Sequence, residues 1–318
     1  MTQKTFPKPQ PYHAGAAFLT LFEKEVLRFR KIALQTVLAP VIMGVMYLAV
    51  FGELLDDKMA TFEGVTYTQF LVPGLVMMSL LQNSFANSAS SLLQSKIMGS
   101  LVFIELPPFS GLQLAAAFIG ASVVRGLVVG IGVFIATFFW GRPMILSPLW
   151  VLAFAVLGAV LMASLGVICG LWADKYDQLG AFQSFVLMPL TFLSGVFYSV
   201  KSLPPVWETA SRFNPFFYMT DGFRYGFFGQ SDFNAWVSLT VLAAAAVVAA
   251  AIAAPYSYHG VKPFIELLGQ DLFQRGVPLT DLNSFAGLFQ TGGALAGLEL
   301  LEKILPRGRT LLRKCDEH

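Results

Sequence analysis

The sequence predicts an all-α polytopic membrane protein: six transmembrane helices, an N-terminal interfacial helix and short re-entrant outer helices. Two observations predict it. Hydrophobic residues make up 56% and charged residues 13% of the 318 residues, with a mean hydropathy of +0.66, whereas soluble domains carry about 25% charged residues. A helix needs roughly 20 apolar residues to cross the hydrocarbon core. Six apolar stretches satisfy this: 33–52, 67–90, 112–140, 149–172, 179–200 and 235–254.

The segment before the first stretch, 13–31, predicts an amphipathic helix on the membrane surface. Its apolar residues recur at helical spacing: Phe18, Leu21, Phe22, Val26 and Phe29. Most charged residues fall on the opposite side: Glu23, Lys24, Arg30 and Lys31. Glu25 interrupts the apolar face. Such a helix anchors at the interface, and its charged side can also meet a cytoplasmic partner.

The second stretch is unusually polar for a membrane crossing. Its amides and hydroxyls are Gln82, Asn83, Ser84, Asn87, Ser88, Ser90 and Ser91. Lipid does not solvate such groups, so they should face other helices or a wet cavity. Two interpretations follow, namely interhelical hydrogen bonding and a polar lining for a translocation path. The candidate path residues are Gln82, Asn83, Asn87 and Arg125.

Arg125 is a charge deep in the third stretch, where it needs a partner or water. We expect it to meet carbonyls, water, or amides such as Asn83 and Asn87. The third and fourth stretches also carry GxxxG motifs, which let helix backbones approach closely. These motifs predict helix–helix or subunit contacts at Gly126, Gly130, Gly166 and Gly170.

The segment before the last stretch is rich in aromatic residues and punctuated by prolines. Glu208 and Arg212 are spaced i,i+4, and Asp221 and Arg224 are spaced i,i+3, which predicts two short helices. We interpret them as re-entrant or interfacial helices at the outer mouth; the alternative is a simple aromatic belt. The candidate outer-gate residues are Trp207, Asn214, Pro215 and Arg224.

Lysine and arginine gather before the first stretch and after the last, which predicts that both termini are cytoplasmic. The expected domains are a cytoplasmic N-terminus with the interfacial helix (1–31), a six-helix membrane domain (32–255) and a cytoplasmic tail (256–318). Within the tail, leucines before Pro306 suggest one amphipathic helix.

Several function classes lack their residues. No GxxxxGK[ST], GxSxG or HExxH motif occurs, and the three histidines lie outside the stretches, so we expect neither an enzyme by itself nor a metal site. An ion-driven carrier or channel remains the alternative function, although intramembrane carboxylates and repeats are missing. A membrane-embedded enzyme would need clustered reactive groups at the membrane boundary. Asp174 and Asp177 lie near one boundary, but we interpret their short loop as a solvated turn. The net charge of +2 does not suggest nucleic acid.

Several blocks together resemble the ABC-2 type permeases, over about 16–254. They are Phe70-Leu71-Val72-Pro73-Gly74-Leu75-Val76-Met77-Met78, Val124-Arg125-Gly126, Gly195-Val196-Phe197-Tyr198-Ser199, Leu203-Pro204-Pro205, Asn214-Pro215 and Gly222-Phe223-Arg224-Tyr225-Gly226. The nearest resemblance is to bacterial inner-membrane permeases of drug and nodulation-factor export.

The resemblance implies the permease subunit of an exporter in the bacterial inner membrane. It would pair with a second permease, preferably a copy of itself, within membrane lipid. A separate ATP-binding-cassette ATPase would bind ATP and Mg²⁺, leaving this chain without cofactors. The implied ATPase-coupling residues lie on the interfacial helix and in the loop after the second stretch: Glu23, Lys24, Arg28, Lys96, Glu105, Pro107 and Pro108. The tail after about residue 256 departs from the family pattern.

Overall fold

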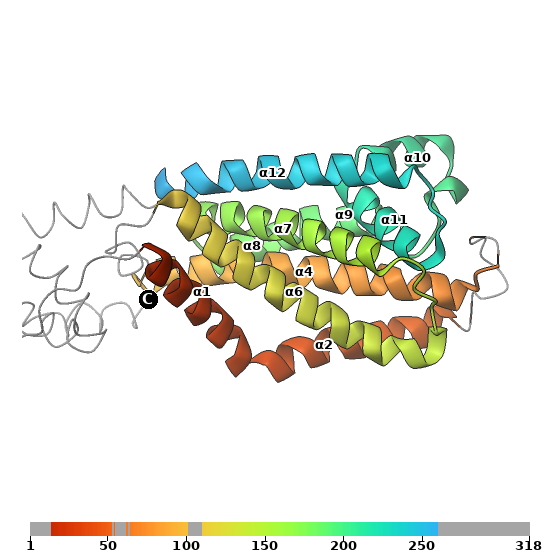
Figure 1. Cartoon of the computed structure of the whole chain (residues 1–318), viewed down its shortest axis with the longest axis horizontal. Coiled ribbons are helices and arrows are strands. Elements are labelled where there is room, and N and C mark those ends of the chain that lie inside the picture. The colour runs from red at the N-terminus through yellow and green to blue at the C-terminus, as the bar shows by residue number, and fades with distance from the viewer. Residues whose placement is uncertain (1–13, 53, 55–61, 63, 101–109, 260–318) are drawn as a thin grey trace, which may run out of the picture.

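The computed structural model describes residues 14–52, 54, 62, 64–100 and 110–259. These residues form helices and short connections, without a strand (Figure 1). Four segments are long and apolar enough to cross a membrane: Ala33–Gly52, Gly111–Gly141, Pro148–Trp172 and Ala235–Pro255. They correspond to α2 (Ala33–Tyr47) with the π-helical η1 (Leu48–Gly52), α6, α7, and most of α12 (Ala235–His259). The all-α, multi-pass membrane architecture predicted from composition is therefore confirmed.

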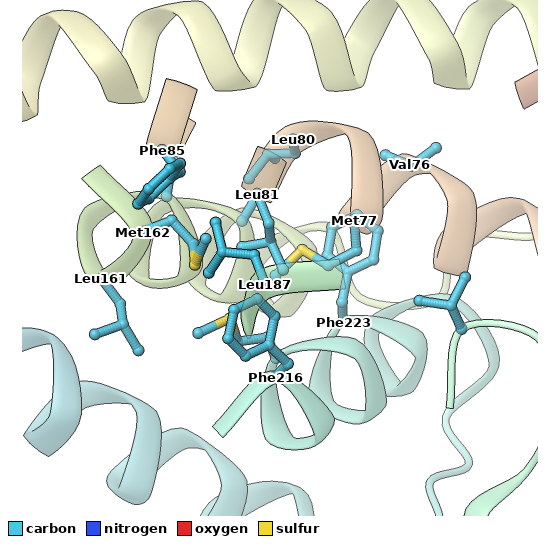
Figure 2. Packing of buried hydrophobic residues seen from close by; sticks show 14 of the residues in the cluster. Val76, Met77, Leu80, Leu81, Phe85, Leu161, Met162, Leu187, Phe216 and Phe223 are labelled. Atoms are coloured by element: carbon cyan, nitrogen blue, oxygen red, sulfur yellow. The ribbon is translucent and has the colours of Figure 1, made fainter. Parts of the chain in front are cut away.

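Helix α4 (Tyr67–Ile97) lies along the middle of the bundle, with α6 and α7 as its main neighbours (Figure 1). It begins at a capping box, in which Thr66 and Gln69 satisfy each other's backbone N–H groups. Its apolar side packs into the main core with α7 and α11, where Met77, Leu81 and Phe223 meet (Figure 2). Polar α4 is not among the four apolar segments, and the surrounding helices shield much of it.

The two GxxxG motifs mark contacts of α6 and α7 with α4. A Cβ atom added at Gly126 of α6 would overlap Ser84 Oγ, and one added at Gly166 of α7 would overlap Ser88 Oγ. Ser88 Oγ also donates a hydrogen bond to the carbonyl oxygen of Ala163 at 2.8 Å. Small residues thus let three backbones pack closely. The prediction of helix–helix contacts is confirmed, and these contacts lie within the chain.

The fifth apolar stretch, expected as one crossing over 179–200, differs from the prediction. The structure has α8 (Tyr176–Phe182), the π-helical η2 (Gln183–Leu187) and α9 (Met188–Phe192), so the helical part starts earlier and ends earlier. The next residues form turns, within which Gly195 adopts a left-handed conformation with φ of 76°. The carbonyl groups of Gly195 and Val196 are thereby free of a helical ladder and accept bonds from elsewhere.

The remaining helices lie near the two ends of the bundle (Figure 1). Helix α1 (Ala14–Lys31) and the last residues of α12 lie at one end, called here the α1 end. The opposite α11 end carries α10 (Pro205–Arg212) and α11 (Pro215–Phe228), after the short η3 (Val200–Ser202). The two short helices predicted from the charge spacings are confirmed. Leu295 to Pro306 and the rest of the tail after 259 lie outside the described residues.

Candidate functional site

Glu25 occupies the centre of a polar cluster that joins α1 to α4. Its side chain is fully buried, and its Oε2 accepts a hydrogen bond from Ser91 Oγ at 2.6 Å. Arg28 Nε lies 3.2 Å from the same oxygen, and Lys24 Nζ lies 3.1 Å from Oε1. The view of Glu25 as an interruption of the apolar face of α1 is therefore incomplete. Instead of facing only the membrane interface, the apolar face of α1 packs against the bundle, with Leu21 and Phe29 buried, and Glu25 enters the bundle with it; the position of α1 at the membrane surface stays a prediction.

Asn87 of α4 connects this carboxylate to Arg125 of α6. Arg28 Nη2 donates to the backbone oxygen of Asn87 at 3.0 Å and to its Oδ1 at 3.2 Å. Arg125 Nη1 donates to the same Oδ1 at 3.2 Å, and its Nη2 donates to Asn83 Oδ1 at 3.4 Å. Asn87 Nδ2 in turn donates to Ser122 Oγ at 2.9 Å. Arg125 thus meets the two amides expected from the sequence. We call Glu25, Arg28, Asn83, Asn87, Ser91, Ser122 and Arg125 the α1 cluster.

The polar residues of α4 divide between two faces of the helix. One face is buried against neighbouring helices and consists of Ser84, Asn87, Ser88, Ser91 and Ser95. The other is only half-buried and consists of Ser79, Gln82, Asn83, Ser90 and Gln94, which we call the polar stripe. Interhelical hydrogen bonding explains the first face. On the second face Asn83 also accepts from Arg125 of α6, whereas the candidate path residue Asn87 lies on the buried face. A polar lining for a translocation path stays a prediction.

Arg224 of α11 is the centre of a second polar site, at the other end of the bundle. Its side chain is 2% exposed. Its guanidinium donates to three backbone oxygens: Phe70 at 3.3 Å, Gly195 at 2.6 Å and Val196 at 2.6 Å. The guanidinium carbon also lies 3.7 Å from the centre of the Phe70 ring. We call Arg224 and these three residues the α11 cluster.

Asp221 and Arg224 do not form the ion pair that their spacing suggests, since Asp221 has other partners. Its two carboxylate oxygens accept the backbone N–H groups of Asp232 at 2.6 Å and Phe233 at 3.1 Å. The reason is that Arg224 extends toward α4 and the turn after α9, whose backbone carbonyls accept its guanidinium N–H groups. Glu208 and Arg212 do pair, at 2.6 Å.

Two of the other outer-gate candidates lie at the start of α11, and the third lies on α10. Asn214 caps α11 by accepting from Phe216 N–H at 3.0 Å, and its Nδ2 donates to the Leu190 oxygen at 2.6 Å. Pro215 is the first residue of α11, where its missing N–H does no harm. The Trp207 side chain on α10 is 56% exposed. The gating role of these residues stays a prediction.

The ATPase-coupling candidates are spread over the α1 end. Glu23 and Lys24 are exposed on α1, whereas the guanidinium of Arg28 turns inward to the α1 cluster. Lys96 closes the end of α4 onto the turn after α7, donating to the oxygens of Leu171 and Ala173 and to Asp174 Oδ1. This ammonium group holds the pKa of the exposed Asp174 carboxyl below its usual range. Glu105, Pro107 and Pro108 lie outside the described residues.

Comparison with known proteins now decides the family. The family model of the ABC-2 type transporter matches residues 16–228, more than half of the chain. This chain belongs to the ABC-2 type transporter family. It is 39% identical over 216 residues to the inner membrane transport permease YadH of Escherichia coli (strain K12), covering 68% of this chain and 84% of that protein. It is 27% identical over 242 residues to nodulation protein J of Rhizobium meliloti (strain 1021), covering 74% of this chain and 90% of that one.

Three of the six sequence blocks that carried the family resemblance meet in space around the α11 cluster. Phe70, Gly195, Val196 and Arg224 come from three of those blocks. Gly74 belongs to the same meeting point, since a Cβ there would lie 2.5 Å from the Val196 oxygen and 2.9 Å from Arg224 Nη2. The blocks thus specify one packing contact between α4, α11 and the turn after α9.

Sequence reasoning missed Glu25 and Ser91 as a buried pair. The only signal was negative, namely a carboxylate on the apolar side of an amphipathic helix. A buried carboxylate needs charged or hydrogen-bonding partners. Those partners come from Arg28 in the same helix and from Ser91, which is 66 residues away.

Proposed function

We propose that this chain is the permease subunit of an ATP-driven exporter in the bacterial inner membrane. The polar stripe of α4 carries the proposal. It places amides and hydroxyls on a half-buried face of a helix that is otherwise enclosed by apolar helices. A membrane protein that only anchors itself has no need for such a face, because lipid leaves its polar groups unsolvated. Gln82 and Asn83, with Arg125 beside them, would line the path, completed by a second copy of this chain.

The proposed topology has six crossings with both termini in the cytoplasm. Two crossings beyond the four apolar segments would be α4, whose polarity is shielded by its neighbours, and the interrupted α8–η2–α9. In support, successive long helices alternate in direction between the two ends of the bundle (Figure 1). The α1 end carries Lys24, Arg28, Arg30, Lys31, Lys96 and Lys175, the excess of positive charge that cytoplasmic segments show. Helices α10 and α11 would then cap the outer mouth.

Energy would come from a separate ATPase that binds ATP and Mg²⁺ and docks at the α1 end. Glu23 and Lys24 offer an exposed charged surface on α1, and the opposite side of α1 is tied to α4 through Glu25 and Arg28. A displacement of α1 by the ATPase would therefore be transmitted to the polar stripe through directly bonded side chains. This would couple the docking site to the path.

An ion-driven carrier is the second candidate, and Glu25 is the residue that favours it. A carrier needs a carboxylate that binds and releases a proton or a cation inside the membrane. Glu25 is buried, but it is already ion-paired with two cationic side chains and accepts a hydrogen bond from the Ser91 hydroxyl. Its paired state favours a fixed structural charge over an exchanging one.

Purification with and without the candidate ATPase tests the proposal. We expect the chain alone to hydrolyse no ATP and the complex to drive transport that survives collapse of the ion gradients. Glu23→Lys should weaken co-purification of the ATPase at least about tenfold, whereas Glu208→Lys on α10 should leave it unchanged. Hydrolysis by the chain alone, or transport that stops with the ion gradient, would contradict the exporter assignment.

A further inference from the structure

The α1 cluster holds more positive charge than its own residues neutralise. Two guanidinium groups, Arg28 and Arg125, converge on one neutral oxygen, Asn87 Oδ1, each at 3.2 Å. The cluster contains one carboxylate, Glu25, and its ion pairs are with Arg28 and Lys24. Among the described residues, Arg125 has amide partners and no carboxylate partner. Like charges this close and partly shielded from bulk water repel each other unless an anion lies between or beside them.

Arg125 also keeps hydrogen-bond donors in reserve. A guanidinium has five N–H groups in a planar fork, and the bonds to Asn83 and Asn87 use two of them. Its Nε is buried without a partner in the described part of the chain. The planar fork matches phosphate and carboxylate oxygens in pairs. The site therefore has both the charge and the donors to take an anionic oxygen group.

The position of Arg125 restricts what can deliver that group. Arg125 is the fifteenth of the 31 residues of α6, a helix that is apolar enough to span the membrane. Its bonded neighbour Asn83 belongs to the polar stripe, which gives a half-open polar route to it. A free inorganic anion would lose its hydration at this depth, whereas an amphiphile arrives with its own apolar portion.

We propose that the α1 cluster binds the anionic headgroup of an amphiphile, a phosphate or a carboxylate, with Arg125 as its principal contact and Arg28 beside it. Two sources share this chemistry: a membrane lipid, and the cargo of the exporter. The cargo source rests on the proposed function, whereas binding itself does not. Glu25 would keep Arg28 in place while leaving the charge of Arg125 for the ligand.

Binding of dodecyl phosphate to the purified full chain in maltoside detergent provides the test, by calorimetric titration. Charge-assisted hydrogen bonds contribute about 1.5–3 kcal/mol each, so Arg125→Gln should raise the Kd about tenfold to a hundredfold. Arg30→Gln removes the same charge from an exposed position of α1 and should change the Kd less than about twofold. Arg125→Lys keeps the charge without the fork and should fall between them.

Two further measurements identify the source. Phosphatidylglycerol retained through purification by the wild-type chain but lost from Arg125→Gln, with phosphatidylcholine equally absent from both, would make membrane lipid the ligand. Dodecyl phosphate binding without retained phosphatidylglycerol would make the cargo headgroup the ligand.

Equal Kd values for the wild type and a folded Arg125→Gln, or tighter binding of inorganic phosphate than of dodecyl phosphate, would overturn the proposal. These assays use the chain without its ATPase, so their outcome is independent of whether transport is ATP-driven.

Discussion

Arg125 and Arg224 are two arginines inside the same helical bundle, and the structure holds them in opposite ways. Arg224 is 2% exposed and saturates its guanidinium with three backbone oxygens and the Phe70 ring. Arg125 is half-buried, uses two donors on side-chain amides and lies near a second guanidinium. Arg224 thus joins separate segments of backbone. Arg125 is positioned by side chains and retains unused donors.

The difference separates a structural role from a binding role. A buried charge is tolerated where fixed dipoles surround it, and the carbonyls around Arg224 provide such dipoles. Removing it leaves the carbonyls of Gly195 and Val196, which lie outside any helix, without the donors they have in the structure. Around Arg125 the partners are neutral amides that can also bond to their own helices, as Asn83 Nδ2 does with the Ser79 oxygen at 3.0 Å. We therefore expect Arg224 to determine stability and Arg125 to determine what the protein binds.

The largest effect should come from Arg224→Gln. Glutamine is too short to replace three donors, and each buried carbonyl left unpaired costs about 1–3 kcal/mol. Several kcal/mol of stability should be lost, seen as a large drop in the unfolding temperature in detergent and in folded yield. Arg212→Gln is the matched control, since its partly exposed pair with Glu208 contributes less than about 1 kcal/mol. Similar unfolding temperatures for both variants would refute the structural role of Arg224.

Glu25→Gln should have the next largest effect, because it leaves Arg28 and Arg125 facing one amide without a carboxylate nearby. Breaking a buried pair costs about 3–5 kcal/mol, and the 27% exposure of Arg28 should reduce this to about 2 kcal/mol. The double variant Glu25→Gln with Arg125→Gln should recover part of that loss, since the remaining charge is then single. Additive losses in this double-mutant cycle would show that the two arginines do not repel each other.

Arg125→Gln alone should change stability little, by less than about 1 kcal/mol in either direction. Asn87 Oδ1 keeps Arg28 as a donor, and removing the charge of Arg125 relieves its repulsion with Arg28. Thermal unfolding of the apo chain in uncharged detergent measures this. A loss as large as that of Arg224→Gln would erase the distinction between the two arginines.

The smallest effect concerns the Lys96–Asp174 contact at the α1 end. Lys96 holds the Asp174 pKa below its unfolded value, so the contact contributes stability that is complete above about pH 5. That contribution disappears as the pH falls through the unfolded and then the folded pKa. The stability difference between the wild type and Asp174→Asn should therefore shrink on acidification. Asp177→Asn, in the first turn of α8, controls for the loss of a carboxylate; an equal trend in both variants would contradict the role of Lys96.

Some features of the fold could be read from local sequence, because they depend on periodicity or on spacing. The apolar face of α1, the close contacts at Gly126 and Gly166, and the meeting of Arg125 with two amides are of this kind. The end of the fifth apolar stretch could not be read, because Val196 is as apolar as the residues before it. The helix ends at Phe192, Gly195 turns the backbone, and the Val196 carbonyl accepts from Arg224, a residue 28 positions later.

The sequence by itself determined that this chain is a helical membrane protein, because the lengths and polarity of its stretches match the dimensions of a bilayer. It also determined the family, because the motif blocks occur in the right order on the right helices. Only the tertiary structure decided which polar residues hydrogen-bond between helices and which lie on a half-buried face. Glu25, Asn87 and Arg224 took their roles from residues that are distant in the chain, and burial set the strength of each contact. Helical periodicity places a side chain on a face, but the neighbouring helices decide what that face meets.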